Sequence, residues 1–116
     1  MKQINYYASP SHGWIKVKIK DLYDLDILLD VSEYSFITSD LQEAYLEEDC
    51  DAGLFVESFG KDKIELIHQE IEEDQANKMI RSCDRLTKEY REALKKYRDL
   101  IVREAESFLK YQHSQF

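Results

Sequence analysis

Trp14-Ile15-Lys16-Val17-Lys18-Ile19-Lys20 is the stretch that decides the fold class. Its apolar side chains alternate with three lysines, and a period of two is typical of a strand with one buried face. The preceding Ser9-Pro10-Ser11-His12-Gly13 predicts a turn, because Pro and Gly interrupt regular structure. Residues 3–8 before that turn are rich in strand formers. The chain therefore begins with two predicted strands.

The segments that follow alternate between helix and strand signals. Asp21 can cap a short helix that runs to about Leu29. Residues 34–38 and 43–47 predict a β-hairpin with a four-residue loop. A further short helix is expected to end at Gly60, the position where a glycine commonly terminates a helix. Residues 1–60 thus predict a compact α+β region with a small antiparallel sheet and short helices.

Residues 61–116 predict a long helical region within the same single domain. No Gly or Pro follows Gly60, and helix formers dominate from Lys63 to about Gln112. Asp62 can cap the start of this predicted helix. An unbroken helix of that length would be roughly 75 Å long. Its apolar face would need to be covered by another chain, so a coiled-coil dimer through residues 76–110 is one hypothesis. A helical hairpin at 72–77 is the alternative. Seven residues are predicted to pack the helix: Met79, Cys83, Leu86, Tyr90, Leu94, Tyr97 and Ile101.

Charge is unevenly distributed along the chain. The net charge is −8, and residues 21–57 contain twelve Asp and Glu but no Lys or Arg. Four lysines precede this block, and the segment after it is balanced in charge. The block therefore accounts for the whole excess of negative charge. Because nucleic-acid binding draws its affinity from Lys and Arg on phosphates, direct nucleic-acid binding is not expected. The block is either a solvated face or a binding surface for a basic partner.

Two features could carry chemistry, and each has a simpler structural interpretation. His12 and Cys50 could form a nucleophilic pair, but no orienting motif or glycine-rich oxyanion segment accompanies them, so a small Cys/His enzyme remains an unfavoured alternative. Residues 47–51 carry four carboxylates without the spacing of an EF-hand, and they suit the start of a helix. We therefore expect no catalytic residue, no metal site and no cofactor.

Cellular context follows from what the sequence lacks. There is no run of 18 apolar residues and no apolar segment near the N-terminus, so neither a membrane span nor a secretory signal is predicted. Cys50 and Cys83 are then expected to be reduced thiols. We expect the protein in the cytoplasm, with no membrane partner.

Three motifs together resemble a family of small proteins encoded by phages and plasmids. They are Pro10-Ser11-His12-Gly13-Trp14, Tyr34-Ser35-Phe36 and Tyr45-Leu46-Glu47-Glu48-Asp49-Cys50-Asp51. The resemblance covers residues 6–56, with Phe36 where the family pattern has a second Tyr. It implies a mobile-element context, in which small acidic proteins often inhibit host defence, including CRISPR effectors. It implies no catalytic or binding residue.

Charge and resemblance together give the leading hypothesis. The protein is expected to be a non-catalytic inhibitor that occupies the basic groove of a host defence nucleic-acid enzyme, in the host cytoplasm. A structural protein that dimerises through its C-terminal helix is the alternative. The residues expected to contact the partner are Asp40, Glu43, Glu47, Glu48, Asp49, Asp51, His12 and Trp14.

Overall fold

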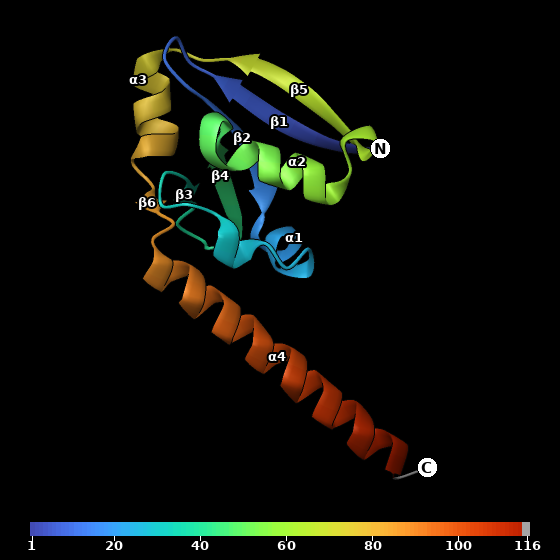
Figure 1. Cartoon of the computed structure of the whole chain (residues 1–116). Coiled ribbons are helices and arrows are strands. Elements are labelled where there is room, and N and C mark those ends of the chain that lie inside the picture. The colour runs from blue at the N-terminus through green and yellow to red at the C-terminus, as the bar shows by residue number, and fades with distance from the viewer. Residues whose placement is uncertain (115–116) are drawn as a thin grey trace.

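A six-stranded sheet forms the centre of the protein, as a computed structural model shows (Figure 1). The structure describes residues 1–114. The strand order is β5-β1-β2-β4-β3-β6, and every neighbouring pair is antiparallel except β1 and β5, which are parallel. The predicted α+β class and the mostly antiparallel sheet are confirmed. The strands are β1 (Lys2–Ala8), β2 (Gly13–Lys18), β3 (Phe36–Ile37), β4 (Glu43–Glu47), β5 (Ile64–Glu70) and β6 (Asp84–Arg85).

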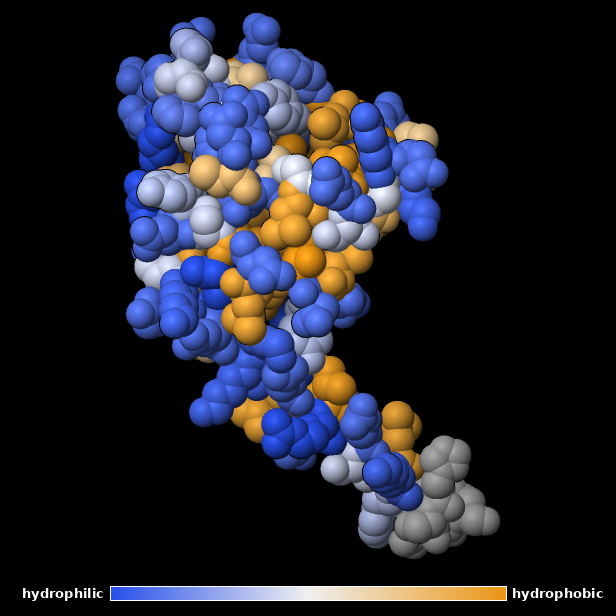
Figure 2. Space-filling model, in the orientation of Figure 1, coloured by the Kyte–Doolittle hydropathy of each residue, from blue (hydrophilic) through white to orange (hydrophobic). Residues whose placement is uncertain are grey.

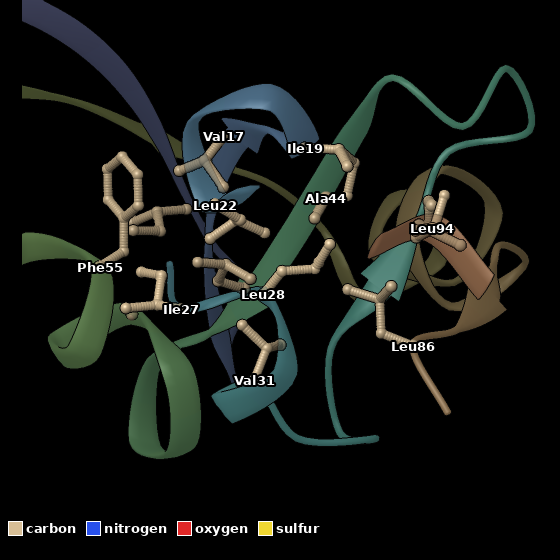
Figure 3. Close-up of a cluster of buried hydrophobic side chains, with 14 of the residues drawn as sticks. Val17, Ile19, Leu22, Ile27, Leu28, Val31, Ala44, Phe55, Leu86 and Leu94 are labelled. Carbon is tan, nitrogen blue, oxygen red and sulfur yellow. The ribbon is translucent and has the colours of Figure 1, made fainter. Parts of the chain in front are cut away.

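Helices and helical turns cover both faces of the sheet. The main core lies between one face and α1 (Ile19–Asp24), η1 (Leu28–Asp30), α2 (Gly53–Phe59) and the start of α4 (Lys88–Ser114). Figure 3 shows Val17, Leu22, Leu28 and Phe55 directed into this core. The opposite face carries Trp14, Phe36 and Tyr45 beneath α3 (Glu73–Ala76) and η4 (Asn77–Arg81).

The first half of the chain folds largely as its sequence predicts. Tyr6 pairs with Ile15 across the predicted turn, and β3 and β4 form the predicted hairpin with a five-residue loop at 38–42. Gly60 ends α2 with a φ of 114°, a backbone conformation that favours glycine. β2 ends two residues early, at Lys18, because Ile19 begins α1 and is fully buried there.

The predicted helix from Lys63 to Gln112 is wrong in its first half. Ile64–Glu70 is the edge strand β5, which pairs with β1 along its whole length. The helical hairpin at 72–77 is also wrong, since a strand precedes that point. The boundary between residues 60 and 61 therefore falls inside one sheet. β5 lies at the edge of the sheet and most of its residues are exposed, so apolar and polar side chains do not alternate along it. Ile64, Ile67 and Ile71 are instead three and four residues apart, which is the spacing of a helix face.

The long C-terminal helix exists, but it is α4 alone, with 27 residues. The Tyr90 N–H donates to Thr87 Oγ1 at 3.2 Å, which caps the first turn. At 1.5 Å per residue α4 is about 40 Å long, and it leaves the body and projects away from the sheet (Figure 1). Within residues 1–114, no helix has the length and apolarity needed to cross a membrane.

The seven residues predicted to pack one helix separate into three groups. Met79, Cys83 and Leu86 precede α4 and pack within the body. Tyr90 and Leu94 attach the first turns of α4 to the main core. Tyr97 and Ile101 lie farther along α4 and are 64% and 49% exposed. The prediction of a continuous packing face over all seven is therefore wrong, because the chain changes direction at β6.

Candidate functional site

The acidic block does not form a single bare acidic face after folding. Its acids meet lysines from the N-terminal segment: Lys2 Nζ lies 2.6 Å from Asp21, and Lys16 Nζ lies 3.6 Å from Glu43. Lys20 pairs with Asp24 one turn later on α1. The N-terminal lysines therefore neutralise part of the block across adjacent elements. Glu43, one of the predicted contact residues, is engaged and half-buried.

Two of the predicted contact residues are internal, which corrects the prediction for them. Asp51 is 2% exposed and accepts hydrogen bonds from Ser32 and Ser35. Glu47 is 8% exposed, and its carboxylate accepts from the backbone N–H groups of Asp49 and Cys50, each at 2.9 Å. Buried carboxylates keep their charge only when hydrogen bonds compensate the loss of water. These two residues therefore organise the turn rather than face a partner.

Three predicted acids remain on the surface. Asp40 is at the tip of the β3–β4 loop, where a hydrogen bond from Thr38 and then one from the Gln42 backbone lower its pKa. Glu48 accepts a hydrogen bond from the Tyr6 hydroxyl, which raises the pKa of Tyr6 to about 12. Asp49 is exposed, and among the described residues its carboxylate has no ion-pair partner. All three keep negative charge at the surface.

His12 and Trp14 line a cavity of about 480 Å³ at the end of the sheet. The Arg81 guanidinium lies over the Trp14 ring at 5.0 Å from its centroid, and Arg81 Nη2 is 3.0 Å from His12 Nδ1. The ring of Trp14 is 1% exposed, so it anchors the site rather than offering a free surface. The lining residues are His12, Trp14, Tyr34, Phe36, Glu47, Asp49, Cys50, Arg81, Cys83 and Arg85.

The structure brings Cys50 and His12 to the same cavity, but it does not activate the thiol. A hydrogen bond to the Glu47 carboxylate, then burial and the surrounding negative charges, raise the pKa of Cys50. A raised pKa leaves less thiolate, which is the nucleophilic form. The His12 ring is engaged by Ser11 and Arg81. In the described part of the chain, no group of three or more His, Cys, Asp or Glu side chains is placed to hold a metal ion.

The far part of α4 carries a second candidate surface. The helix face that packs on the body through Tyr90 and Leu94 continues at helical spacing through Tyr97, Ile101 and Phe108. Figure 2 shows apolar residues along this projecting segment. We call the exposed large apolar residues between positions 97 and 109 the free stripe: Tyr97, Leu100, Ile101, Val102, Phe108 and Leu109.

A cavity of about 370 Å³ lies where the free stripe meets the body. The β3–β4 loop forms one wall, and Leu41 in that loop is 39% exposed with a φ of 63°. A positive φ is strained for leucine, because its Cβ crowds the backbone. The full lining is Asp40, Leu41, Gln42, Tyr90, Ala93, Leu94, Tyr97 and Arg98.

Charge also separates between the body and α4. Residues 1–87 hold nine Lys and Arg against nineteen Asp and Glu, a net charge of −10. Residues 88–114 hold seven Lys and Arg against five Asp and Glu, a net charge of +2. The body is therefore the acidic part of the molecule, and α4 is a weakly basic arm.

Several residues of these surfaces could not be placed from the sequence. Arg81 and Arg85 reach the His12 cavity from a segment that the sequence had assigned to a helix, so no local pattern placed them there. Nothing in the sequence distinguished Leu41 from an ordinary loop residue. Comparisons with known protein families, curated proteins and solved structures found no match to this chain.

Proposed function

We propose that the protein is a non-catalytic binding protein of a phage or mobile element, which inhibits a host defence nucleic-acid enzyme such as a CRISPR effector. Its acidic body would occupy a basic groove in place of nucleic acid. The observation that carries this proposal is the net charge of −10 on residues 1–87. Carboxylates on a compact body attract grooves lined by Lys and Arg and speed association with them.

The contact residues of this proposal differ from those inferred from the sequence. Glu47 and Asp51 are internal, so the surface is assigned to exposed block acids whose carboxylates have no hydrogen-bond or ion-pair partner within residues 1–114. These are Asp26, Asp30, Glu33, Asp49 and Glu57. Such carboxylates are free to meet guanidinium and ammonium groups of a partner, with little loss of internal bonding.

The state of Cys50 supports binding over catalysis. A cysteine nucleophile needs a lowered pKa or an adjacent free base. Here the pKa of Cys50 is raised, and Nδ1 of His12 is already engaged by Ser11 and Arg81.

The proposal is tested with a charge-reversed variant carrying Asp30→Lys, Glu33→Lys and Asp49→Lys. The control carries Glu70→Lys, Glu72→Lys and Asp74→Lys, which makes the same change in charge at exposed positions outside the block. Each protein is titrated into guide-loaded CRISPR nucleases with labelled target DNA, and both DNA binding and cleavage are measured.

We expect the wild type and the control to displace DNA from at least one nuclease, with an effect that weakens as salt rises. The block variant should lose this activity. Equal inhibition by the block variant and the control would contradict the electrostatic mechanism, and no displacement from any nuclease in the panel would contradict the proposed target class.

A second candidate function is assembly, in which the protein dimerises through α4. The free stripe favours it, because it continues a face that is already used for packing. Exposed apolar surface of this kind is typical of an interaction site.

A further inference from the structure

The edge strand β5 carries backbone groups that point away from the sheet. β5 pairs only with β1, and the sheet ends there. The Ile71 N–H, just after β5, donates to the Ala8 carbonyl at 2.9 Å and therefore faces β1. Because successive residues of a strand direct their backbone groups to opposite sides, every second residue of β5 faces outward. The outward residues are Ile64, Leu66, His68 and Glu70.

β5 lacks the usual protection of an edge strand. Soluble proteins commonly shield such a strand with Pro, Lys, a bulge or a covering element. Residues 64–70 contain no Pro or Lys, and β5 pairs with β1 residue for residue without a bulge. Among residues 1–114 no backbone group bonds to its outer side, and Figure 1 shows β5 at the border of the sheet remote from α4. The edge is therefore open to the addition of a strand.

We infer that β5 pairs with β5 of a second copy of this chain, antiparallel, with Ile67 at the two-fold axis. The two sheets then form one continuous sheet of twelve strands. A two-fold axis uses the same patch on both chains, so the strand must be complementary to itself. The inference goes beyond both candidate functions, because it uses neither the acids of residues 21–57 nor α4.

The backbone of β5 selects this register. In an antiparallel pair, outward groups bond only where an outward residue lies opposite another outward residue. Centring the pair on Ile67 places all four outward residues of each chain in such positions, which gives about eight hydrogen bonds. Sliding one strand by two residues loses one of the four positions. Sliding it by one residue sets every outward residue opposite an inward one.

The side chains that meet across the axis are compatible. Ile67 is half-buried in one chain and lies opposite the partner's Ile67, at a Cα distance of about 4.5 Å. Glu65 lies opposite the partner's Gln69, whose amide can donate to the carboxylate. Leu66, which is 47% exposed, lies opposite the partner's His68 and gains cover. No residue of β5 lies opposite a like charge, and this fit favours a second copy over an unrelated strand as the occupant.

The position of β5 keeps the rest of the two molecules apart. β5 lies at one end of the body and α4 leaves from the other end (Figure 1). In the pair, the two α4 helices therefore point away from the shared edge. The free stripe of each chain stays exposed.

Disulfide trapping tests the register. Ile67→Cys, Glu65→Cys and Gln69→Cys are each made in a chain that also carries Cys50→Ser and Cys83→Ser. After oxidation, the Ile67→Cys chain should form a covalent dimer by itself, because opposite residues without backbone bonds are close enough for a disulfide. The Glu65→Cys and Gln69→Cys chains should each stay monomeric under reducing-agent-free denaturing electrophoresis and form a covalent dimer only when mixed.

A matched pair of charge variants tests the assembly itself. Ile67→Lys places two ammonium groups opposite each other at the axis, whereas Gln69→Lys places each one opposite the partner's Glu65. Both variants add one positive charge to the same face of β5, so a difference between them reports position. Light scattering at several concentrations should show a wild-type dimer that Ile67→Lys weakens roughly ten-fold or more and Gln69→Lys leaves at least as tight.

Other outcomes would overturn the inference. They include equal dimers in Ile67→Lys and Gln69→Lys, and a disulfide of Glu65→Cys with itself. A dimer that is lost in Ile101→Asp but kept in Ile67→Lys would place assembly on α4 instead. A wild-type monomer at every concentration, with no trapped dimer, would leave this edge to a strand of another protein. Trapping decides the matter even if Ile67→Lys unfolds, and a failure here leaves the inhibitor proposal standing, because that proposal is tested by displacement of DNA.

Discussion

Asp51 accepts two hydrogen bonds from Ser32, one through each carboxylate oxygen. The Ser32 backbone N–H donates to Oδ1 at 2.9 Å, and the Ser32 hydroxyl donates to Oδ2 at 2.8 Å. The Ser35 hydroxyl donates to the same Oδ2 and in turn accepts from the Glu47 backbone N–H at 3.0 Å. This buried network joins the loop before β3 to the turn after β4, and it explains why the acid-rich segment 47–51 is structural in part.

Removing the Asp51 carboxylate should therefore destabilise the fold. Asp51→Ala leaves the half-buried Ser32 and the buried Ser35 without their acceptor, and we expect the free energy of unfolding to fall by about 3 kcal/mol. Asp49→Ala, which removes an exposed carboxylate two residues away, should change it by less than about 0.5 kcal/mol. Urea unfolding followed by circular dichroism measures both. Similar losses in the two variants would contradict the structural role of Asp51.

Two glycine substitutions should have opposite effects on stability. A Cβ at Gly13 would collide with the Tyr6 hydroxyl and the Glu48 carboxylate, so Gly13→Ala should cost about 1 kcal/mol. At Gly53 a Cβ meets nothing within 4 Å and the backbone is helical, so Gly53→Ala should stabilise by about 0.5 kcal/mol. Thermal unfolding compares them directly. Equal melting temperatures for the two variants would contradict the packing around Gly13.

The bond between Tyr6 and Glu48 should be visible in alkaline titration. The hydrogen bond raises the folded-state pKa of Tyr6 to about 12, above the ordinary tyrosine value of 10.0. The unfolded chain then loses this proton first, so stability should fall as pH rises from about 10 to about 12. NMR of labelled tyrosine rings should give the high midpoint, and Glu48→Gln should move it toward 10. A wild-type midpoint near 10 would contradict the bond.

Glu73 should titrate far below an ordinary glutamate. Hydrogen bonds from Ser9 and Ser11, followed by that from Arg81, lower its pKa to about 2 from 4.5. Because the folded-state pKa is depressed, the stability it contributes is present above about pH 4.5 and is lost as pH falls toward 2. Carboxyl NMR titration measures the midpoint, and Ser11→Ala should raise it. A midpoint near 4.5 in the wild type would show that the network around Glu73 does not form in solution.

The sequence predicts local elements well where one side chain pattern dominates. The alternation in residues 14–20 places β2, and Gly60 places the end of α2. The sequence pattern did not predict β5, because Ile64, Ile67 and Ile71 have helical spacing in an otherwise exposed strand. Three β-branched isoleucines in eight residues were a signal for strand. Thr87, three residues before Tyr90, was a signal for the true start of α4.

The candidate surfaces were less predictable, because they depend on contacts between distant segments. Counting acids could not show that Lys2 and Lys16 would neutralise Asp21 and Glu43, which requires the sheet register. Nor could a continuous helical pattern show that Leu86 packs inside the body while Ile101 is half exposed. The apolar residues of α4 are visible in the sequence, but they form an exposed stripe only because α4 projects from the body.

Hydrogen exchange of the backbone amides in residues 97–111 is the most direct measurement of the α4 pairing. An isolated helical segment of that length is marginally stable in water, so its amides should exchange quickly unless another chain covers the free stripe. We predict protection that increases with protein concentration and disappears in Ile101→Asp, which places a carboxylate in the middle of the free stripe, but persists in Ser107→Asp, about 120° around the helix from Ile101. Exchange at the rate of an unfolded peptide at every concentration would contradict the account.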